Sequence, residues 1–184
     1  VDDLIVYKKA DNQYFIVVNA ANKDKDYQWM LAHQFGKATF KDVSDQYAQL
    51  ALQGPKAMEI LRKIAEEEDI PKKYYHAVFE GKVAGIPCII SKTGYTGEDG
   101  VELYLDAGLA EKLWDILLEA GKEEGLIPCG LGARDTLRME AAMPLYGHEM
   151  DDEVTPLETG LGFAVKMAKE DFVGKDALIA RGIR

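Results

Sequence analysis

The chain has 184 residues, of which 47% are hydrophobic and 29% are charged, a composition typical of one large globular domain or two small ones. Asp and Glu number 32 against 22 Lys and Arg, so the formal net charge is −10. This balance argues against a nucleic-acid partner and against an anionic membrane surface, because like charges repel. No apolar run approaches the roughly 20 residues of a membrane span. Two cysteines are too few for a disulfide framework.

In chain order, the first predicted element is a β-hairpin. Two strand-like runs, 4–7 and 14–18, flank the turn residues Asp11-Asn12. Apolar residues at helical spacing then predict a helix over 27–35, and Gly36 is expected to stop it.

Strands and helices alternate through the rest of the chain. Patterning predicts strands at 48–53, 77–79, 83, 86–90 and 101–105, with turns at Gly81 and Gly85. It predicts helices at 55–65, where Pro55 would occupy the first turn, at 109–120, at 131–143, and a short one from Ala177. The spacing is not that of regular βαβ units. We therefore predict an α+β fold of mostly antiparallel sheets with packed helices.

The two ends suggest a piece of a longer protein. The chain begins with Val1 in a strand-like run, and its last residues read as an unfinished helix. Breaks near Gly54-Pro55 and near residues 155–162 divide it further. We expect residues 1–54 to be the second half of one α+β lobe, 55–159 a second α+β lobe, and 160–184 the start of a connection to a further domain.

The segment Thr93–Glu102, TGYTGEDGVE, is the clearest candidate for chemistry. Its glycines recur every three residues and would let a ligand approach the backbone, although an ordinary loop between strands fits equally well. It lacks GKS or GKT, and its acids would repel phosphate, so it is not a phosphate loop. Glu102 lies on one face of the following strand. In a pocket it would accept two parallel N–H bonds, whereas on a solvated face it would be unremarkable in function.

Two charged features need separate explanations. Arg138 follows Asp135 by three residues, so a helix-surface ion pair accounts for it. Arg134 lies near the start of the same helix, where a cation opposes the helix dipole, so it either binds a ligand or pairs elsewhere in the fold. Asp2 and Asp3 precede a strand and would point to opposite faces, one to solvent and the other into a cleft.

The sequence gives little indication of a metal site or of a catalytic nucleophile. The three histidines, His33, His76 and His148, lack the spacing of a metal site, and we predict none. Cys88 lies in an apolar strand, where a core role is expected.

Taken together, these segments resemble the glycine cleavage system T protein family of tetrahydrofolate-dependent aminomethyltransferases. The matching stretches include VDDLIVY (1–7), VVNAAN (17–22), ALQGP (51–55), SKTGYTGEDGVELY (91–104), CGLGARDTLRMEAAMPLYGHE (129–149), TPLETGLGFAVK (155–166) and DFVGKDAL (171–178). The resemblance covers essentially the whole chain. It implies a T-protein-like fold with folate bound in a central channel. It also implies that the C-terminal barrel domain of the family is missing from this chain.

The resemblance also implies roles for six residues. The family's catalytic carboxylate falls on Asp3, beside the reacting nitrogens of the pterin. Its folate-binding residues fall on Tyr7, Asn19, Tyr95, Glu102 and Arg134. Glu102 would anchor the pterin, and the tyrosines would offer ring contacts. In these terms, segment 1–54 carries the catalytic carboxylate and segment 55–159 is the folate-binding lobe.

The implied reaction is an aminomethyl transfer from a lipoylated H protein to tetrahydrofolate, with release of ammonia. The fragment alone would be inactive, because half of the channel is missing. The compartment would be the cytoplasm in a bacterium or the mitochondrial matrix in a eukaryote. Two alternatives stay open: a folate-dependent demethylation domain of a sarcosine or dimethylglycine oxidase, and a non-enzymatic folate-binding relative.

Overall fold

The computed structural model describes residues 2–182, which divide into two compact units. The first, here called the terminal unit, comprises residues 2–5, 16–33 and 144–182. The second, the sheet unit, comprises Val6–Phe15 and Gln34–Met143. Both units are discontinuous in sequence. The division expected from sequence, into residues 1–54, 55–159 and 160–184, uses continuous ranges and stays a prediction. Among the described residues, no helix combines the length and apolarity needed to cross a membrane.

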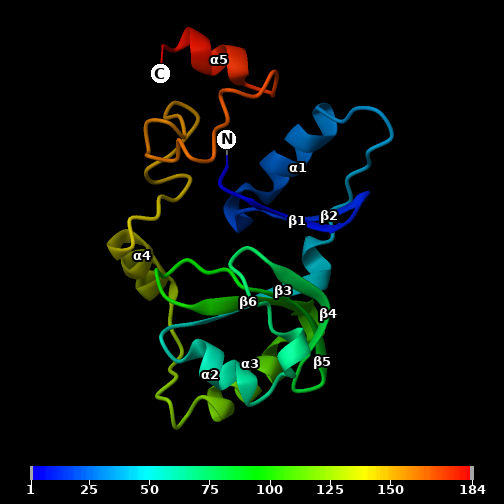
Figure 1. The fold of residues 1–184 in the computed structure, drawn as a ribbon, viewed down its shortest axis with the longest axis vertical. Coiled ribbons are helices and arrows are strands. Elements are labelled where there is room, and N and C mark those ends of the chain that lie inside the picture. Colours follow the sequence, from blue (N-terminus) through cyan, green and yellow to red (C-terminus); the bar gives the residue numbers. More distant parts are fainter. Residues whose placement is uncertain (1, 183–184) are drawn as a thin grey trace. The chain divides into compact units, whose positions relative to one another are not determined.

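The sheet unit is built on a four-stranded sheet in the order β3-β6-β5-β4 (Figure 1). The strands are β3 (Tyr47–Gln53), β4 (Ala77–Val83), β5 (Ile86–Ser91) and β6 (Gly100–Asp106). All three strand pairings are antiparallel. Between β4 and β5, Ala84 and Gly85 both have positive φ, as a tight two-residue hairpin turn requires. These pairings confirm the predicted α+β class with mostly antiparallel sheet.

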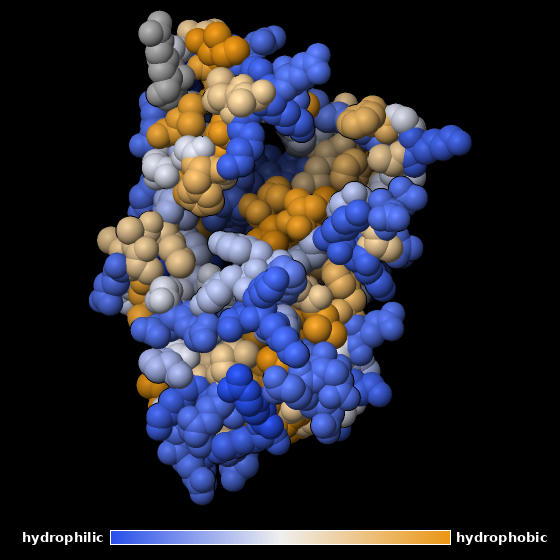
Figure 2. Space-filling model, in the orientation of Figure 1, coloured by the Kyte–Doolittle hydropathy of each residue, from blue (hydrophilic) through white to orange (hydrophobic). Residues whose placement is uncertain are grey.

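Helices α2 (Ala57–Arg62) and α3 (Ala110–Ala120) pack on one face of this sheet (Figure 1). Apolar residues of the strands and of both helices form the hydrophobic core there, with the least exposed side chains being Leu61, Val83, Ile90, Val101, Leu103 and Leu113. Burying each such side chain contributes about 1.5–3 kcal/mol. Hydrophilic side chains dominate the surface over these helices (Figure 2).

The remaining elements flank this core or belong to the terminal unit. They are the hairpin strands β1 (Ile5–Ala10) and β2 (Gln13–Val17) and helices α1 (Lys23–Ala32), α4 (Leu131–Glu140) and α5 (Lys175–Ala180). Short 3₁₀ turns lie at Ala20–Asn22, Ser44–Gln46, Glu67–Asp69 and Ala107–Leu109. The predicted hairpin is confirmed. Three residues lie outside the described part of the chain. They are residue 1, in the first strand-like run, and residues 183–184, in the final short helix predicted from sequence.

Three local predictions are wrong in detail. Gly81 is not a turn but lies within β4 opposite Cys88, beside a shift in strand register. A Cβ at Gly81 would lie 2.9 Å from the side chain of Ile90, so glycine is needed for close packing rather than for a turn. Pro55 precedes α2 instead of occupying its first turn. Helix α1 ends four residues before Gly36, since His33 already caps it.

Gly100 should be a sensitive position in this sheet. A Cβ there would lie 2.5 Å from the backbone oxygen of Leu52, which is held in the β3–β6 ladder and has no room to move. We expect Gly100→Ala to lower the free energy of unfolding by about 1–3 kcal/mol, as overpacking does. Gly132 in α4 has open space around it, so Gly132→Ala should change stability by less than about 1 kcal/mol. Urea unfolding measures the free energy of unfolding of both variants. Equal losses of stability in the two variants would contradict the prediction.

Candidate functional site

The carboxylate of Asp3 is half-buried in the terminal unit, directly before β1. The side-chain amide of Asn19 donates to Oδ1 of Asp3 at 2.5 Å and to the backbone oxygen of the same residue at 3.2 Å. The backbone N–H of Tyr146 donates to the same Oδ1 at 3.3 Å. The structure thus brings together two of the predicted site residues, Asp3 and Asn19. It adds Tyr146, which sequence reasoning did not single out.

The neighbouring Asp2 holds Asn19 in place. Its Oδ1 accepts from the side-chain amides of Asn19 at 2.8 Å and Asn22 at 3.0 Å, and its Oδ2 accepts from the backbone N–H of Asn19 at 3.2 Å. The expectation that one carboxylate of the pair would be solvated is therefore wrong. Both are half-buried, because the chain here has not yet entered β1 and curls around Asn19.

Burial and hydrogen bonding set the proton affinities of three aspartates. Burial raises the pKa of Asp3 above its ordinary value, although the bonds from Tyr146 and Asn19 oppose the rise. Burial would also raise the pKa of Asp2, but hydrogen bonds, first of all from Asp26, outweigh it and lower that pKa. Burial, followed by the hydrogen bond to Asp2 and its charge, raises the pKa of Asp26 to about 6.

Tyr146 is itself fixed from two sides. The Lys25 ammonium lies 3.9 Å from the centroid of its ring, and its hydroxyl donates to Oδ1 of Asp152 at 2.7 Å. These contacts steady the residue whose backbone N–H reaches Asp3. In the sequence, Tyr146 was visible only as part of the string 129–149 that carries the family resemblance.

Glu102 lies on the face of the sheet opposite α2 and α3, in the sheet unit. In the strand ladder it pairs with Ala51 of β3 and Ser91 of β5. Its Oε1 accepts from the side-chain amide of Gln49 at 2.6 Å. Its Oε2 accepts from the Thr93 hydroxyl, and the Tyr104 hydroxyl donates to the same oxygen at 3.4 Å.

Behind Glu102 lies a group of four buried hydroxyls, here called the hydroxyl cluster: Tyr7, Ser91, Thr93 and Tyr104. Their residues are 4%, 0%, 2% and 3% exposed. Ser91 Oγ lies 2.9 Å from both the Tyr7 hydroxyl and Thr93 Oγ1, and the Tyr7 hydroxyl lies 3.3 Å from those of Thr93 and Tyr104. Burial and the charge of Glu102 raise the pKa of Tyr104, which keeps its hydroxyl a proton donor.

Two of the three glycines of segment 93–102, Gly94 and Gly100, have a packing explanation around Gln53. The side-chain amide of Gln53 donates to the backbone oxygens of Thr93 and Val101, each at 3.1 Å. A Cβ at Gly94 or at Gly100 would collide with this amide. These two glycines therefore let Gln53 clamp the loop to the start of β6, two residues before Glu102.

Arg134 and Tyr95, both predicted to bind folate, lie against each other in the sheet unit. The Arg134 guanidinium lies 4.5 Å from the centroid of the Tyr95 ring, and the Tyr95 hydroxyl donates to the backbone oxygen of Met143 at 3.4 Å. Arg134, for which the sequence offered no partner, thus has an aromatic one, and its side chain remains exposed.

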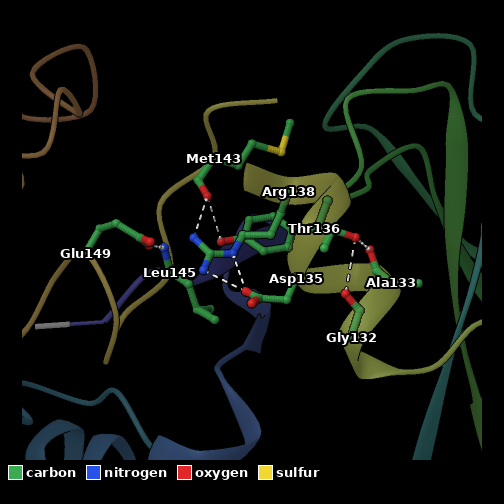
Figure 3. Close-up of polar contacts among 9 residues, drawn as sticks. Gly132, Ala133, Asp135, Thr136, Arg138, Met143, Leu145 and Glu149 are labelled. Carbon is green, nitrogen blue, oxygen red and sulfur yellow. Dashed lines mark hydrogen bonds and ion pairs between the residues drawn. The ribbon is translucent and has the colours of Figure 1, made fainter. Parts of the chain in front are cut away.

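Arg138 has the structural role that its spacing predicts. It is 1% exposed, and its Nε donates to Oδ1 of Asp135 at 2.8 Å, with a further guanidinium contact at 2.7 Å. It also donates to the backbone oxygen of Met143 at 3.3 Å (Figure 3). The ion pair is confirmed. Its arginine is buried while the Asp135 side chain is 45% exposed, and the bond to Met143 ties α4 to the chain that follows it.

Metal-ligating groups do not gather in the part of the chain that the structure describes: no three His, Cys, Asp or Glu side chains are placed to hold an ion. Cys88 is 4% exposed, and burial raises the pKa of its thiol to about 11. It is therefore a core residue, as its sequence surroundings predict.

Comparison with known proteins places these features in a family. Residues 1–169 match the family described as "GCVT N-terminal domain", and the chain belongs to that family. A solved structure titled "Crystal structure of glycine cleavage system aminomethyltransferase T from Bartonella henselae" superposes with a TM-score of 0.82 at 30% identity. The superposition covers 98% of this chain and 48% of that one. The fold resemblance inferred from sequence is confirmed.

Closely similar sequences carry one name. A protein named aminomethyltransferase from Caldanaerobacter subterraneus subsp. tengcongensis is 54% identical over 180 residues, covering 97% of this chain and 48% of that protein. Another of the same name, from a strain of Bacillus cereus, is 54% identical over 179 residues, covering 97% of this chain and 49% of its own length. The chain spans about half the length of the curated relatives it matches.

The acid pair formed by Asp2 and Asp26 should make stability depend on pH. Asp26 is 8% exposed, and its pKa of about 6 lies above the ordinary 3.8. The folded state therefore binds more protons between these values, and stability falls as pH rises through that window. Asp26→Asn keeps a donor to Asp2 without the charge. We expect it to raise the free energy of unfolding at about pH 8 by about 1–3 kcal/mol, and by much less at about pH 4.5.

Urea unfolding at the two pH values measures this difference. Asp24→Asn is the matched control, because Asp24 lies on the same helix with its side chain 94% exposed, and it should show no such pH dependence. A gain for Asp26→Asn that is the same at both pH values would contradict the prediction.

Proposed function

We propose that this chain is the folate-binding half of a tetrahydrofolate-dependent aminomethyltransferase of the glycine cleavage system. The observation that carries the proposal is the setting of Glu102, a strand-borne carboxylate with both oxygens held by neighbouring donors. A pterin presents an amino group and a ring N–H side by side. A carboxylate fixed in one orientation matches that pair of donors bidentately.

The reaction proposed is transfer of a one-carbon unit. An H protein would bring a lipoyl arm bearing –S–CH₂–NH₃⁺. Its methylene carbon would form bonds to N5 and N10 of tetrahydrofolate while its bonds to sulfur and to the ammonium nitrogen break, and the protons of N5 and N10 would pass to the sulfur and to the ammonia released. The products are methylenetetrahydrofolate, ammonia and the reduced lipoyl arm. Nucleophile and leaving group both belong to the substrates, so the protein acts mainly by orienting them.

Asp3 would supply the charge that this step needs. Asn19 and the backbone N–H of Tyr146 hold its carboxylate in place, and burial raises its pKa. A held carboxylate favours positive charge developing on a folate nitrogen or accepts a proton from it. Asp3 is the catalytic residue of the proposal, and Asn19 keeps it oriented.

Arg134 and Tyr95 would bind the folate beyond its pterin ring. An exposed guanidinium stacked on an aromatic ring keeps donors free at its edge for a carboxylate such as those of the folate tail. Tyr7, the sixth residue assigned from the family resemblance, is buried in the hydroxyl cluster.

The neighbouring readings are less well supported. The similar proteins named above are aminomethyltransferases, which favours this function over a demethylation domain of an oxidase or a non-enzymatic folate-binding protein. Those relatives are bacterial, which supports a cytoplasmic location. The H protein as partner follows from the same proposed function.

Glu102→Ala should weaken folate binding. Removing a charge-assisted pair of hydrogen bonds costs about 1.5–3 kcal/mol, which is on the order of tenfold to a hundredfold in affinity. Calorimetric titration of 5-formyltetrahydrofolate into the full-length protein measures the loss. Glu80→Ala is the matched control, because Glu80 is an exposed glutamate of the same sheet, and it should leave affinity unchanged. Unchanged affinity in the Glu102 variant would overturn the proposed anchor.

Asp3→Ala should separate catalysis from binding. We expect it to abolish most turnover with an aminomethylated H protein while leaving the affinity for 5-formyltetrahydrofolate largely intact. Asp11→Ala removes an exposed aspartate from the hairpin turn and should have no effect on either quantity. Normal turnover in the Asp3 variant would remove Asp3 from the mechanism.

A further inference from the structure

The hydroxyl cluster behind Glu102 is not accounted for by the proposed function. Tyr7, Ser91, Thr93 and Tyr104 come from β1, β5, the loop after β5, and β6, and each is at most 4% exposed. Four polar side chains together in the interior are expensive unless every hydroxyl finds a partner. The contacts among them, all at 2.9–3.4 Å apart from the closer Thr93–Glu102 bond, meet that need.

The hydrogen bonds of the hydroxyl cluster all run toward Glu102. An ionised carboxylate only accepts hydrogen bonds, so Thr93 and Tyr104 both donate to Oε2 of Glu102. Each of these hydroxyls has a single proton, so neither donates anywhere else. Tyr7 and Ser91 then donate within the cluster, and the chain of donors ends on Glu102 whichever way those two hydroxyls turn.

The arrangement divides the work between the two oxygens of Glu102. Oε2 is held by buried donors, whereas the bond from Gln49 to Oε1 lies at the exposed side of the sheet face. Together these donors keep the carboxylate in a single orientation, with Oε1 on its exposed side. The Glu102 side chain therefore loses its rotational freedom when the protein folds, and ligand binding carries no further entropic cost for it.

The position of Tyr7 also indicates a role in holding Glu102. Its ring packs against those of Tyr104 and Phe15, with centroids 6.1 and 6.4 Å apart, and the residue is 4% exposed. A ring so enclosed has no free face on which to stack a ligand. Its hydroxyl, by contrast, lies within 3.3 Å of the other three members of the cluster.

We propose that Thr93, together with Tyr7 and Tyr104, positions the Glu102 carboxylate for the ligand, and that Tyr7 acts through its hydroxyl rather than through a stacked ring. The inference rests on the proposed function, since it takes Glu102 as the folate anchor. Thr93 and its partners are positioning residues, because they act through Glu102.

The test is a double-mutant cycle in the full-length protein, with calorimetric titration of 5-formyltetrahydrofolate. Thr93→Val keeps the shape of the side chain and removes the hydroxyl, and should weaken binding about tenfold. Thr93→Ser restores the donor and should recover most of the affinity. In a Glu102→Ala background, Thr93→Val should cause no further loss, because the residue through which it acts is gone.

Tyr7→Phe gives an independent measurement, should Thr93→Val fold poorly. It keeps the ring and removes only the hydroxyl, so a ring that stacks on the ligand predicts unchanged affinity. Positioning through the hydroxyl predicts weaker binding, again absent in the Glu102→Ala background. Circular dichroism and the midpoint of thermal unfolding confirm that each variant compared is folded.

The outcomes separate the two proposals. If Glu102→Ala weakens binding but Thr93→Val and Tyr7→Phe do not, the positioning inference fails and the folate anchor stands. If the Thr93→Val loss persists in the Glu102→Ala background, Thr93 contacts the ligand directly, and the inference is overturned. If Glu102→Ala leaves binding unchanged, the anchor itself fails, and the positioning role fails with it.

Discussion

The antiparallel pairing of β6 with β3 on one side and β5 on the other is the constraint on which the sheet unit depends. Side chains alternate between the two faces of a strand, so this pairing sorts the residues of all three strands at once. Leu103 and Leu105 turn toward the helices and join the apolar core, while Glu102 and Tyr104 turn to the other face. A shift of one residue would exchange the two sets.

The same register explains why a carboxylate can be held there. Ser91 lies opposite Glu102 across the β5–β6 ladder, and Tyr104 is two residues further along on the same face. Polar groups that are distant in the sequence thereby become neighbours. The cost of burying them is offset because each hydroxyl has a partner and the network ends on a charge. Gly94 and Gly100 serve this arrangement, since they make room for Gln53.

The terminal unit shows a different solution to holding a carboxylate. No sheet positions Asp3, and its neighbours instead come from a turn of chain around Asn19 and from the backbone N–H of Tyr146. Asp2 and Asp26 stabilise that turn at the expense of placing acids close together, which is why one of them has a raised pKa. Burial disfavours the ionised form of Asp3, and the nearby charge of Asp2 adds to this effect.

Local patterning in the sequence was enough to predict the hairpin, the strands, the main helices and the α+β class, because periodicity and turn residues act over short distances. It also predicted the pairing of Arg138 with Asp135, three residues apart. It misplaced the turn at Gly81 and expected a solvated carboxylate in the pair Asp2 and Asp3, because these features depend on residues far along the chain or on a close approach that no local pattern records. Resemblance to a family supplied Asp3, Asn19 and Glu102. Only the tertiary structure decided that Tyr7 is buried and that its hydroxyl joins the network behind Glu102, since strand register, not local sequence, determines which side chains share a face.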